Sequence, residues 1–231
     1  MPTQAALVPL DDKNFGLALC WFLQASRFGR YSGSGTTSLE EDLRDIEANS
    51  SMQDAVQALL TRFPYLEPLT REDFLRDYAD TRFGRFLLYL FVYRNQAKDW
   101  DEHGHRIGFE GVTLLADFRP QWHHIFPQKY LEGKVEESKI DALANIAVIG
   151  PAINIRISAA DPMSYVTKYA ISPEKLTQQF IHPSFTTTPI ANYIDWLERR
   201  ADQLAEEGNA FLAELRASLA RTERTAGRPT S

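Results

Sequence analysis

Apolar residues recur at helical spacing through the first part of the chain. The clearest case is the segment 52–63, in which apolar side chains stand three and four positions apart. They are Ala55, Val56, Leu59, Leu60 and Phe63. This spacing predicts an amphipathic helix, and similar patterns predict helices over residues 14–25 and 39–48. We therefore expect a helical scaffold here.

A capping signal and a long apolar run follow. Thr70 and, three residues later, Asp73 resemble a capping box, which predicts a helix that begins there and runs towards Gln96. The run 86–93 within it is wholly apolar or aromatic. It falls far short of the roughly 20 residues that cross a bilayer, so it predicts a buried helix and no membrane span.

Glycine and serine residues over 27–37 indicate a loop between the first two predicted helices. The loop lacks the Gly-Lys-Ser/Thr ending of a phosphate-binding loop, so it does not indicate nucleotide hydrolysis. Its cations and tyrosine are open to two interpretations: contact with DNA, or pairing with the acidic helix 39–48. These residues are Arg27, Arg30 and Tyr31.

The pattern changes after a polar segment at 99–105. The segments 107–118 and 121–127 are short, rich in β-branched or aromatic residues and punctuated by proline, which predicts strands. A polar loop at 132–141 precedes a further predicted strand at 144–149. We therefore expect the order strand, loop, strand, helix in this region.

Prolines mark further helix starts, because proline suits the first turn of a helix. They are Pro151, Pro162, Pro173 and Pro189. From Pro189 to about Arg221, apolar residues alternate at spacings of four and three, which predicts one long helix or a helical hairpin hinged at Gly208. This seam contains alanine and glycine, so packing on the chain's own helices is favoured over a coiled-coil dimer.

Composition narrows the classes of protein to consider. The chain has 231 residues, 44% of them hydrophobic, which excludes disorder and allows one or two domains. Its 25 basic and 31 acidic residues give a net charge of −6, so any nucleic acid must be held by local cations. The single cysteine, Cys20, is expected in the core. Residues 1–14 lack a signal-peptide pattern, which leads us to expect a cytoplasmic protein.

The densest group of chemically versatile side chains comprises His123, His124, Asn145 and Asn154. Neighbouring strand residues point to opposite faces, so both histidines can line one site only if the strand ends there, as Pro127 suggests. Imidazole is a metal ligand and a general base near neutral pH. An asparagine carbonyl oxygen suits a cation such as Mg²⁺.

These residues resemble the HNH nuclease motif on a ββα-metal fold. In particular, the segments 123–128, 143–147 and 154–158 resemble the C-terminal HNH domain of GmrSD-type, modification-dependent restriction enzymes. The His-Ile-Phe-Pro-Gln string and the nine-residue gap between the two asparagines carry the resemblance, which is specific over about residues 119–170.

The resemblance implies a role for each residue. His124 would be the general base that activates water, and His123 with Asn154 would hold one divalent ion, Mg²⁺ or Mn²⁺. Asn145 would brace the loop that orients the base. Arg156 is a weaker candidate for binding a neighbouring phosphate.

The fold expected from the resemblance is α+β, predominantly helical, with a small ββα-metal (HNH) unit at 106–172. Helical regions at 1–105 and 173–231 would flank it. The expected function is metal-dependent cleavage of DNA, as the cleavage half of a phage-defence restriction system that acts on modified foreign DNA. Members of the family carry an N-terminal nucleotide-dependent, ParB-like domain. Nothing in these residues matches that domain, so we expect it as a partner besides DNA.

Less specific interpretations stay open. The histidines could be a structural pair at a strand end, and the chain could be a non-catalytic interaction or DNA-docking module derived from the same family. A secreted toxin nuclease is disfavoured, because no delivery segment is visible. A second polar cluster is expected to be a solvated loop and not a metal site. It comprises Asp99, Asp101, Glu102, His103 and His105. His182 is expected in a loop.

Overall fold

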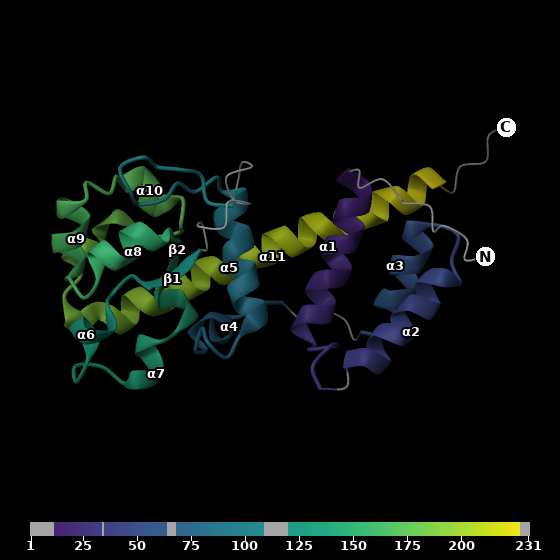
Figure 1. Ribbon diagram of the computed structural model, residues 1–231, viewed down its shortest axis with the longest axis horizontal. Coiled ribbons are helices and arrows are strands. Elements are labelled where there is room, and N and C mark those ends of the chain that lie inside the picture. The colour runs from purple at the N-terminus through teal and green to yellow at the C-terminus, as the bar shows by residue number, and fades with distance from the viewer. Residues whose placement is uncertain (1–11, 34, 64–67, 109–119, 227–231) are drawn as a thin grey trace. The chain divides into compact units, whose positions relative to one another are not determined.

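Helices dominate the chain, and one two-stranded antiparallel sheet accompanies them (Figure 1). The computed structural model describes residues 12–33, 35–63, 68–108 and 120–226. It is predominantly helical and α+β, which confirms this part of the predicted fold class. No helix among the described residues is long and apolar enough to cross a membrane.

The chain forms two compact units. The first comprises residues 1–68 and 209–231, as far as they are described, and the second comprises Leu69–Gly208. The predicted nuclease segment, 106–172, lies within the second unit. The long helix α11 (Tyr193–Ala226) contributes residues to both units.

The first unit is built from α1 (Asp12–Arg27), α2 (Gly35–Glu47) and α3 (Met52–Leu60), close to the predicted helices (Figure 1). Ser51 begins α3 by accepting a hydrogen bond from the Asp54 amide. The apolar face of α3 is buried, as its spacing predicted, and it packs against α1 and α2. Cys20 is buried, which confirms its predicted place in the core.

An ion cluster ties the loop after α1 to α2. Asp42, which is 1% exposed, accepts hydrogen bonds from Arg30 Nε (2.9 Å) and from the Tyr31 hydroxyl (2.6 Å). Burial alone would raise the pKa of Asp42, but these hydrogen bonds and the nearby arginines hold it below its usual value. Of the two interpretations of this loop, pairing of Arg30 and Tyr31 with the acidic helix is the observed one.

In the second unit, the prediction of one continuous helix from Thr70 towards Gln96 is wrong. The capping box at Thr70 is present, but α4 (Arg71–Leu75) ends within two turns, and α5 (Arg82–Arg94) begins after a new cap. Between them, the chain pairs with a distant segment. Leu143 donates to the Arg76 carbonyl and Tyr78 donates to the Asp141 carbonyl, both at 2.9 Å. These bonds replace those that would have continued the helix.

The inner face of α5 is buried, as predicted for the run 86–93. Its buried residues are Gly84, Leu87, Leu88, Phe91 and Val92. The predicted strand 107–118 lies outside the described residues, apart from Ile107 and Gly108, which form a turn.

The sheet pairs β1 (Gln121–His124) with β2 (Ile146–Ile149), and His123 lies opposite Ala147. Both strands are shorter than predicted. The predicted strand 121–127 ends at His124, and the first residues of 144–149 belong to a 3₁₀ turn, η2 (Leu143–Asn145). All four residues of β2 are buried.

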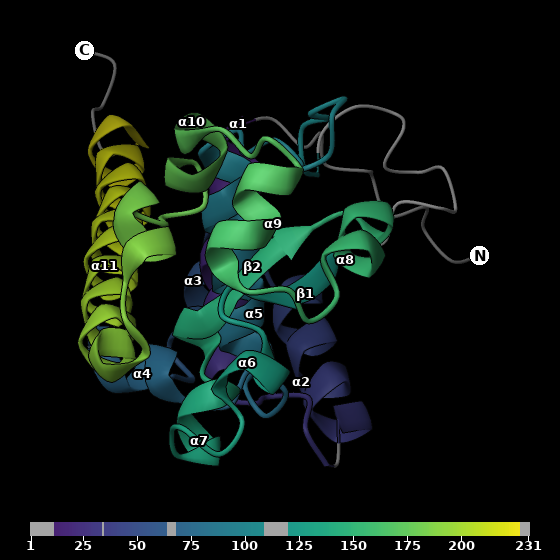
Figure 2. The ribbon, with the colours of Figure 1, turned by 90° about the vertical axis from the view of Figure 1, so that its left-hand side faces the viewer.

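Proline-led helices follow, as predicted: α8 (Pro151–Ile157), α9 (Pro162–Lys168) and α10 (Pro173–Thr177). Short turns α6 (Gln128–Leu131), α7 (Glu137–Ile140), η3 (Pro183–Thr187) and η4 (Ile190–Asn192) complete the second unit. After Pro189, the chain first forms η4 and then α11. Helix α11 continues unbroken past Gly208, so of the two predicted alternatives the long helix is observed and the hairpin is not. Figure 2 shows α8 beside the two strands, and α8 contacts β1.

Candidate active site at the end of strand β1

A pocket of about 400 Å³ lies where β1 ends, and three of the predicted site residues line it. They are His123, His124 and Asn154. The strand ends at His124, and this is the condition under which neighbouring histidines can line one site. Tyr78 and Lys129 also contribute to the lining.

His123 is held deep in the second unit. It is 4% exposed, and its Nδ1 lies 2.9 Å from Oδ1 of Asn154, on α8. Burial lowers the pKa of His123 to about 4, and the hydrogen bond to Asn154 opposes this shift only in part. The imidazole is therefore neutral near pH 7 and retains a lone pair on one nitrogen.

The other nitrogen of His123, Nε2, is buried and lacks a hydrogen-bond partner among the described residues. The ring stands nearly perpendicular to Trp100 (centroids 5.6 Å apart) and to Tyr165 (5.8 Å), which stack on each other. The indole N–H of Trp100 is likewise buried without a hydrogen-bond partner among the described residues.

The contact with Asn154 depends on which nitrogen of His123 carries the proton. With the proton on Nδ1, the ring donates to the Asn154 carbonyl oxygen at 2.9 Å, and the buried Nε2 is an acceptor without a partner among the described residues. With the proton on Nε2, Nδ1 and the carbonyl oxygen are both acceptors, and a cation between them would relieve their repulsion. Both atoms are ones that a divalent cation binds, so this second tautomer is the one in which the pair could hold a metal.

His124 is paired with a carboxylate. Its Nε2 lies 2.8 Å from Oδ1 of Asp141, which also accepts a hydrogen bond from Gln128 Nε2 at 2.7 Å. Burial lowers the pKa of His124 and outweighs the opposing effect of Asp141. The neutral ring donates from Nε2 to Asp141, so Nδ1 holds the lone pair, and no described residue hydrogen-bonds to it.

Asn145 is fully buried and does not line the pocket. Its Oδ1 accepts from the Phe126 amide (3.0 Å), and its Nδ2 donates to the carbonyls of Phe126 (3.0 Å) and Ile140 (2.9 Å). The side chain therefore fixes the turn that follows β1, directly after the two histidines. This placement is compatible with the bracing role that the resemblance implies.

Arg156 is exposed on α8 and does not line the pocket. The cation that does is Lys129, and the guanidinium of Arg85 lies 5.9 Å from the ring centre of Trp122, another lining residue. These two side chains are better placed than Arg156 to meet a phosphate near the histidines.

Sequence reasoning missed Asp141, Tyr78 and Lys129. Asp141 is 17 residues from His124 and ends a polar loop, so no local spacing connects the two. The backbone pairing of Tyr78 with Asp141 accompanies the placement of Tyr78 in the pocket lining and of Asp141 at His124. Tyr78 then packs edge-on against His124, with ring centres 5.4 Å apart.

The second polar cluster is a solvated loop only in part. Glu102, His103 and His105 are exposed, as predicted, but Asp99 is 3% exposed and the prediction is wrong for it. Its Oδ1 accepts from the amides of Trp100 (2.8 Å) and Gly150 (2.9 Å), which fixes the start of α8. Within the described residues, no group of three or more His, Cys, Asp or Glu side chains could hold a metal.

Comparison of the chain with protein-family models, with curated protein sequences and with solved structures found no match.

Proposed function

We propose that this chain is a metal-dependent DNA endonuclease of the HNH type. One observation carries the proposal: a single pocket contains Nδ1 of His123 and the carbonyl oxygen of Asn154, 2.9 Å apart, and, beside them, His124, which is hydrogen-bonded to Asp141. Hydrolysis of a phosphodiester needs a positioned base and a positive charge at the phosphate, and these two pairs match those needs.

His123 and Asn154 would hold the metal. Adjacent ligands of an octahedral Mg²⁺ are about 3 Å apart, because each lies 2.0–2.1 Å from the ion, and the observed separation of 2.9 Å fits this value. A bound Mg²⁺ or Mn²⁺ would neutralise charge that develops on the phosphate and support the leaving 3′-oxygen. With only two protein ligands, coordination positions remain for water and phosphate oxygens.

His124 acts as the base in this proposal. Its Nδ1 accepts the proton of the attacking water, while the Nε2 proton stays on the ring and is shared with Asp141. The carboxylate stabilises the imidazolium that forms. Because burial lowers the pKa of His124, the ring is in its neutral, proton-accepting form near pH 7.

DNA would be held by few charges. The chain carries a net charge of −6, and the cations next to the pocket are Lys129 and Arg85. We expect weak non-specific affinity with a shallow salt dependence. Selection of modified foreign DNA in phage defence would then fall to a nucleotide-dependent, ParB-like domain or subunit, and the enzyme would act in the cytoplasm.

The test is cleavage of plasmid or phage DNA by the purified chain with Mg²⁺ or Mn²⁺. We expect His124→Ala to lower the rate by about 10²–10⁴-fold, the usual contribution of a general base. The matched control is His105→Ala, which removes an exposed histidine outside the pocket. Equal activity in His124→Ala and the native chain would contradict the assignment of the base. A folded chain that neither cleaves DNA nor binds Mn²⁺ would favour a non-catalytic docking module.

A further inference from the structure

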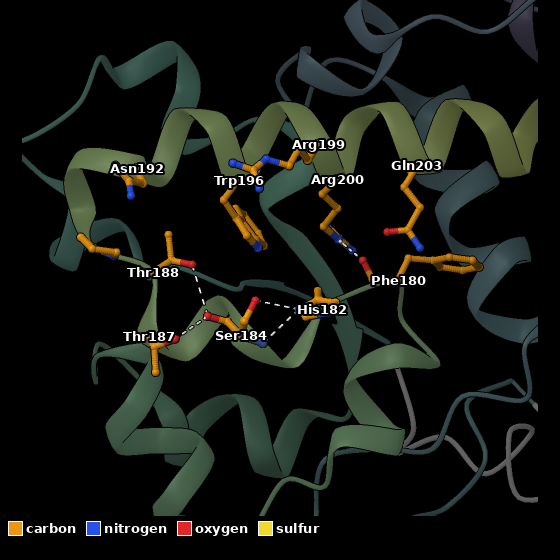
Figure 3. A pocket seen from close by; sticks show the side chains of 11 residues that line it. Phe180, His182, Ser184, Thr187, Thr188, Asn192, Trp196, Arg199, Arg200 and Gln203 are labelled. Carbon is orange, nitrogen blue, oxygen red and sulfur yellow. Dashed lines mark hydrogen bonds between the residues drawn. The ribbon is translucent and has the colours of Figure 1, made fainter.

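A second pocket, of about 480 Å³, lies between residues 180–192 and the first turns of α11 (Figure 3). All of its lining belongs to the second unit, and none of it is shared with the histidine pocket. The lining contains Arg199, Arg200 and His182 and no aspartate or glutamate. In a chain with more acidic than basic residues, this arrangement is a local reversal of charge.

Arg200 is the unusual member of this lining. It is 3% exposed, and its guanidinium donates to the carbonyls of Phe180 (3.1 Å), Ala144 (2.5 Å) and Gln179 (3.0 Å). None of these partners carries a negative charge. Three of the five guanidinium N–H groups are thus used, and two are left.

The charge of Arg200 persists near neutral pH, although burial lowers its pKa to about 9. A buried cation without a counter-charge is costly, and an anion that enters the pocket relieves that cost. No ion pair of Arg200 with a described residue does so.

The remaining polar groups of the lining include both donors and acceptors. His182 Nδ1 accepts from the Ser184 amide at 3.2 Å, so the neutral ring carries its proton on Nε2. Thr187 and Thr188 donate their hydroxyl protons to the Ser184 carbonyl and keep their lone pairs (Figure 3).

Three further donors come from α11. The side chains of Trp196, Arg199 and Gln203 line the same pocket, and none of them forms a hydrogen bond or ion pair with another described residue. Arg199 is exposed, so its guanidinium is available at the rim, whereas Arg200 lies at the base. Two guanidinium groups, an indole N–H and an amide thus border a space whose lining includes no carboxylate.

We propose that this pocket binds the terminal phosphate of a small phosphorylated molecule, a phosphomonoester such as a nucleoside monophosphate, between Arg200 and Arg199. Guanidinium groups bind phosphate through paired N–H donors. The pocket volume is within the range of small-molecule sites.

The depth of Arg200 selects a terminal phosphate over the DNA backbone. A buried guanidinium is reached only by a group that enters the pocket. The phosphate of a phosphomonoester can enter, because three of its oxygens carry no further substituent. A backbone phosphate has a sugar on either side and is held by exposed cations instead. The site is therefore independent of the proposed nuclease, and either can fail without the other.

The test is titration of the full chain with inorganic phosphate and with adenosine monophosphate. Binding is measured by calorimetry and by the NMR shifts of backbone amides. We expect saturable binding with shifts at Ser184 and Thr188. Arg199→Gln should weaken binding about tenfold, because one charge-assisted contact is lost. The matched control, Arg82→Gln, changes an exposed arginine of α5 that does not line the pocket and should bind like the native chain.

A second variant avoids Arg200, whose three backbone contacts make it part of the fold. Thr188→Asp places a carboxylate in the lining and should abolish binding while the amide spectrum elsewhere stays native. Absence of saturable binding to the native chain would overturn the proposal. Binding by Arg199→Gln and Thr188→Asp that equals binding by the native chain would overturn it as well. Acetate that shifts the same amides as strongly would overturn the assignment to phosphate. A DNA duplex that shifts them at lower concentration than the nucleotide would overturn the assignment to a small molecule.

Discussion

Two pockets of the second unit differ in the polar groups that line them. At the end of β1, the imidazoles of His123 and His124 lie beside the carbonyl oxygen of Asn154, whereas the pocket beside α11 is lined by two arginines, one of them buried, and by no carboxylate. Buried polar groups are normally satisfied, so a group without a partner indicates the charge of a ligand that would satisfy it. On this ground we propose a metal cation for the first pocket and an anion for the second.

The ion cluster of the first unit shows the contrasting case. Asp42 is as deeply buried as Arg200, but Arg30 and Tyr31 satisfy it. Burial of a charge is thus not by itself evidence of a ligand site. The two buried charges differ in whether the fold supplies a counter-charge.

The largest expected effect concerns the scaffold of the first pocket. Asn145→Ala leaves the buried amide and carbonyl of Phe126 and the carbonyl of Ile140 without their partner. We expect a loss of about 3 kcal/mol in the free energy of unfolding, measured by urea denaturation. Asn95→Ala, which removes one exposed hydrogen bond, should cost less than about 1 kcal/mol. Equal losses in the two variants would show that Asn145 does not brace the turn.

A smaller effect is expected at Asp141, the partner of the proposed base His124. Asp141→Asn keeps the shape of the side chain but removes the charge that orients His124 and stabilises its protonated form. Second-sphere partners of this kind are worth about 10–100-fold, so the rate of DNA cleavage should fall by that factor while Mn²⁺ affinity changes little. If Asp141→Asn instead loses affinity for Mn²⁺ and the metal-loaded variant cleaves at the native rate, Asp141 would be a metal ligand and not the partner of His124.

Sequence and structure agree where the information is local. Helical spacing predicted α1 to α3, and proline predicted the starts of α8 to α10. The proximity of His123, His124 and Asn154 followed from the motif, because the strand, the turn and the next helix are consecutive in the chain.

What the sequence could not supply depends on distant segments. The break between α4 and α5 and the approach of Asp141 to His124 have one cause, the pairing of residues 76–78 with 141–143. Asp99 lies in a polar stretch typical of a loop, yet its burial depends on Gly150, 51 residues away. Arg200 lies in the segment from Pro189 to Arg221, whose apolar seam predicts only helix packing, and its uncompensated charge is visible only in three dimensions.

The smallest effect is expected in the first unit. The pKa of Asp42 is held below its usual value, so its contribution to stability is complete above about pH 4 and is lost as the pH falls through the lower, folded-state pKa. We expect Asp42→Asn to cost about 1–2 kcal/mol at pH 7, and the difference from the native chain to shrink at pH 2–3. Denaturation followed at several pH values measures this. A difference that grows in acid would contradict the assignment of Asp42 as an ion that is satisfied within the fold.

The metal claim is tested most directly by pulsed electron paramagnetic resonance of the chain loaded with Mn²⁺, which detects the nitrogen of a coordinated imidazole. We expect a nitrogen coupling in the native chain that disappears in His123→Ala and persists in His124→Ala, because only His123 faces Asn154. The persistence in His124→Ala also separates the ligand from the base. A native spectrum without nitrogen coupling, or a coupling that depends on His124 and not on His123, would contradict the proposed site.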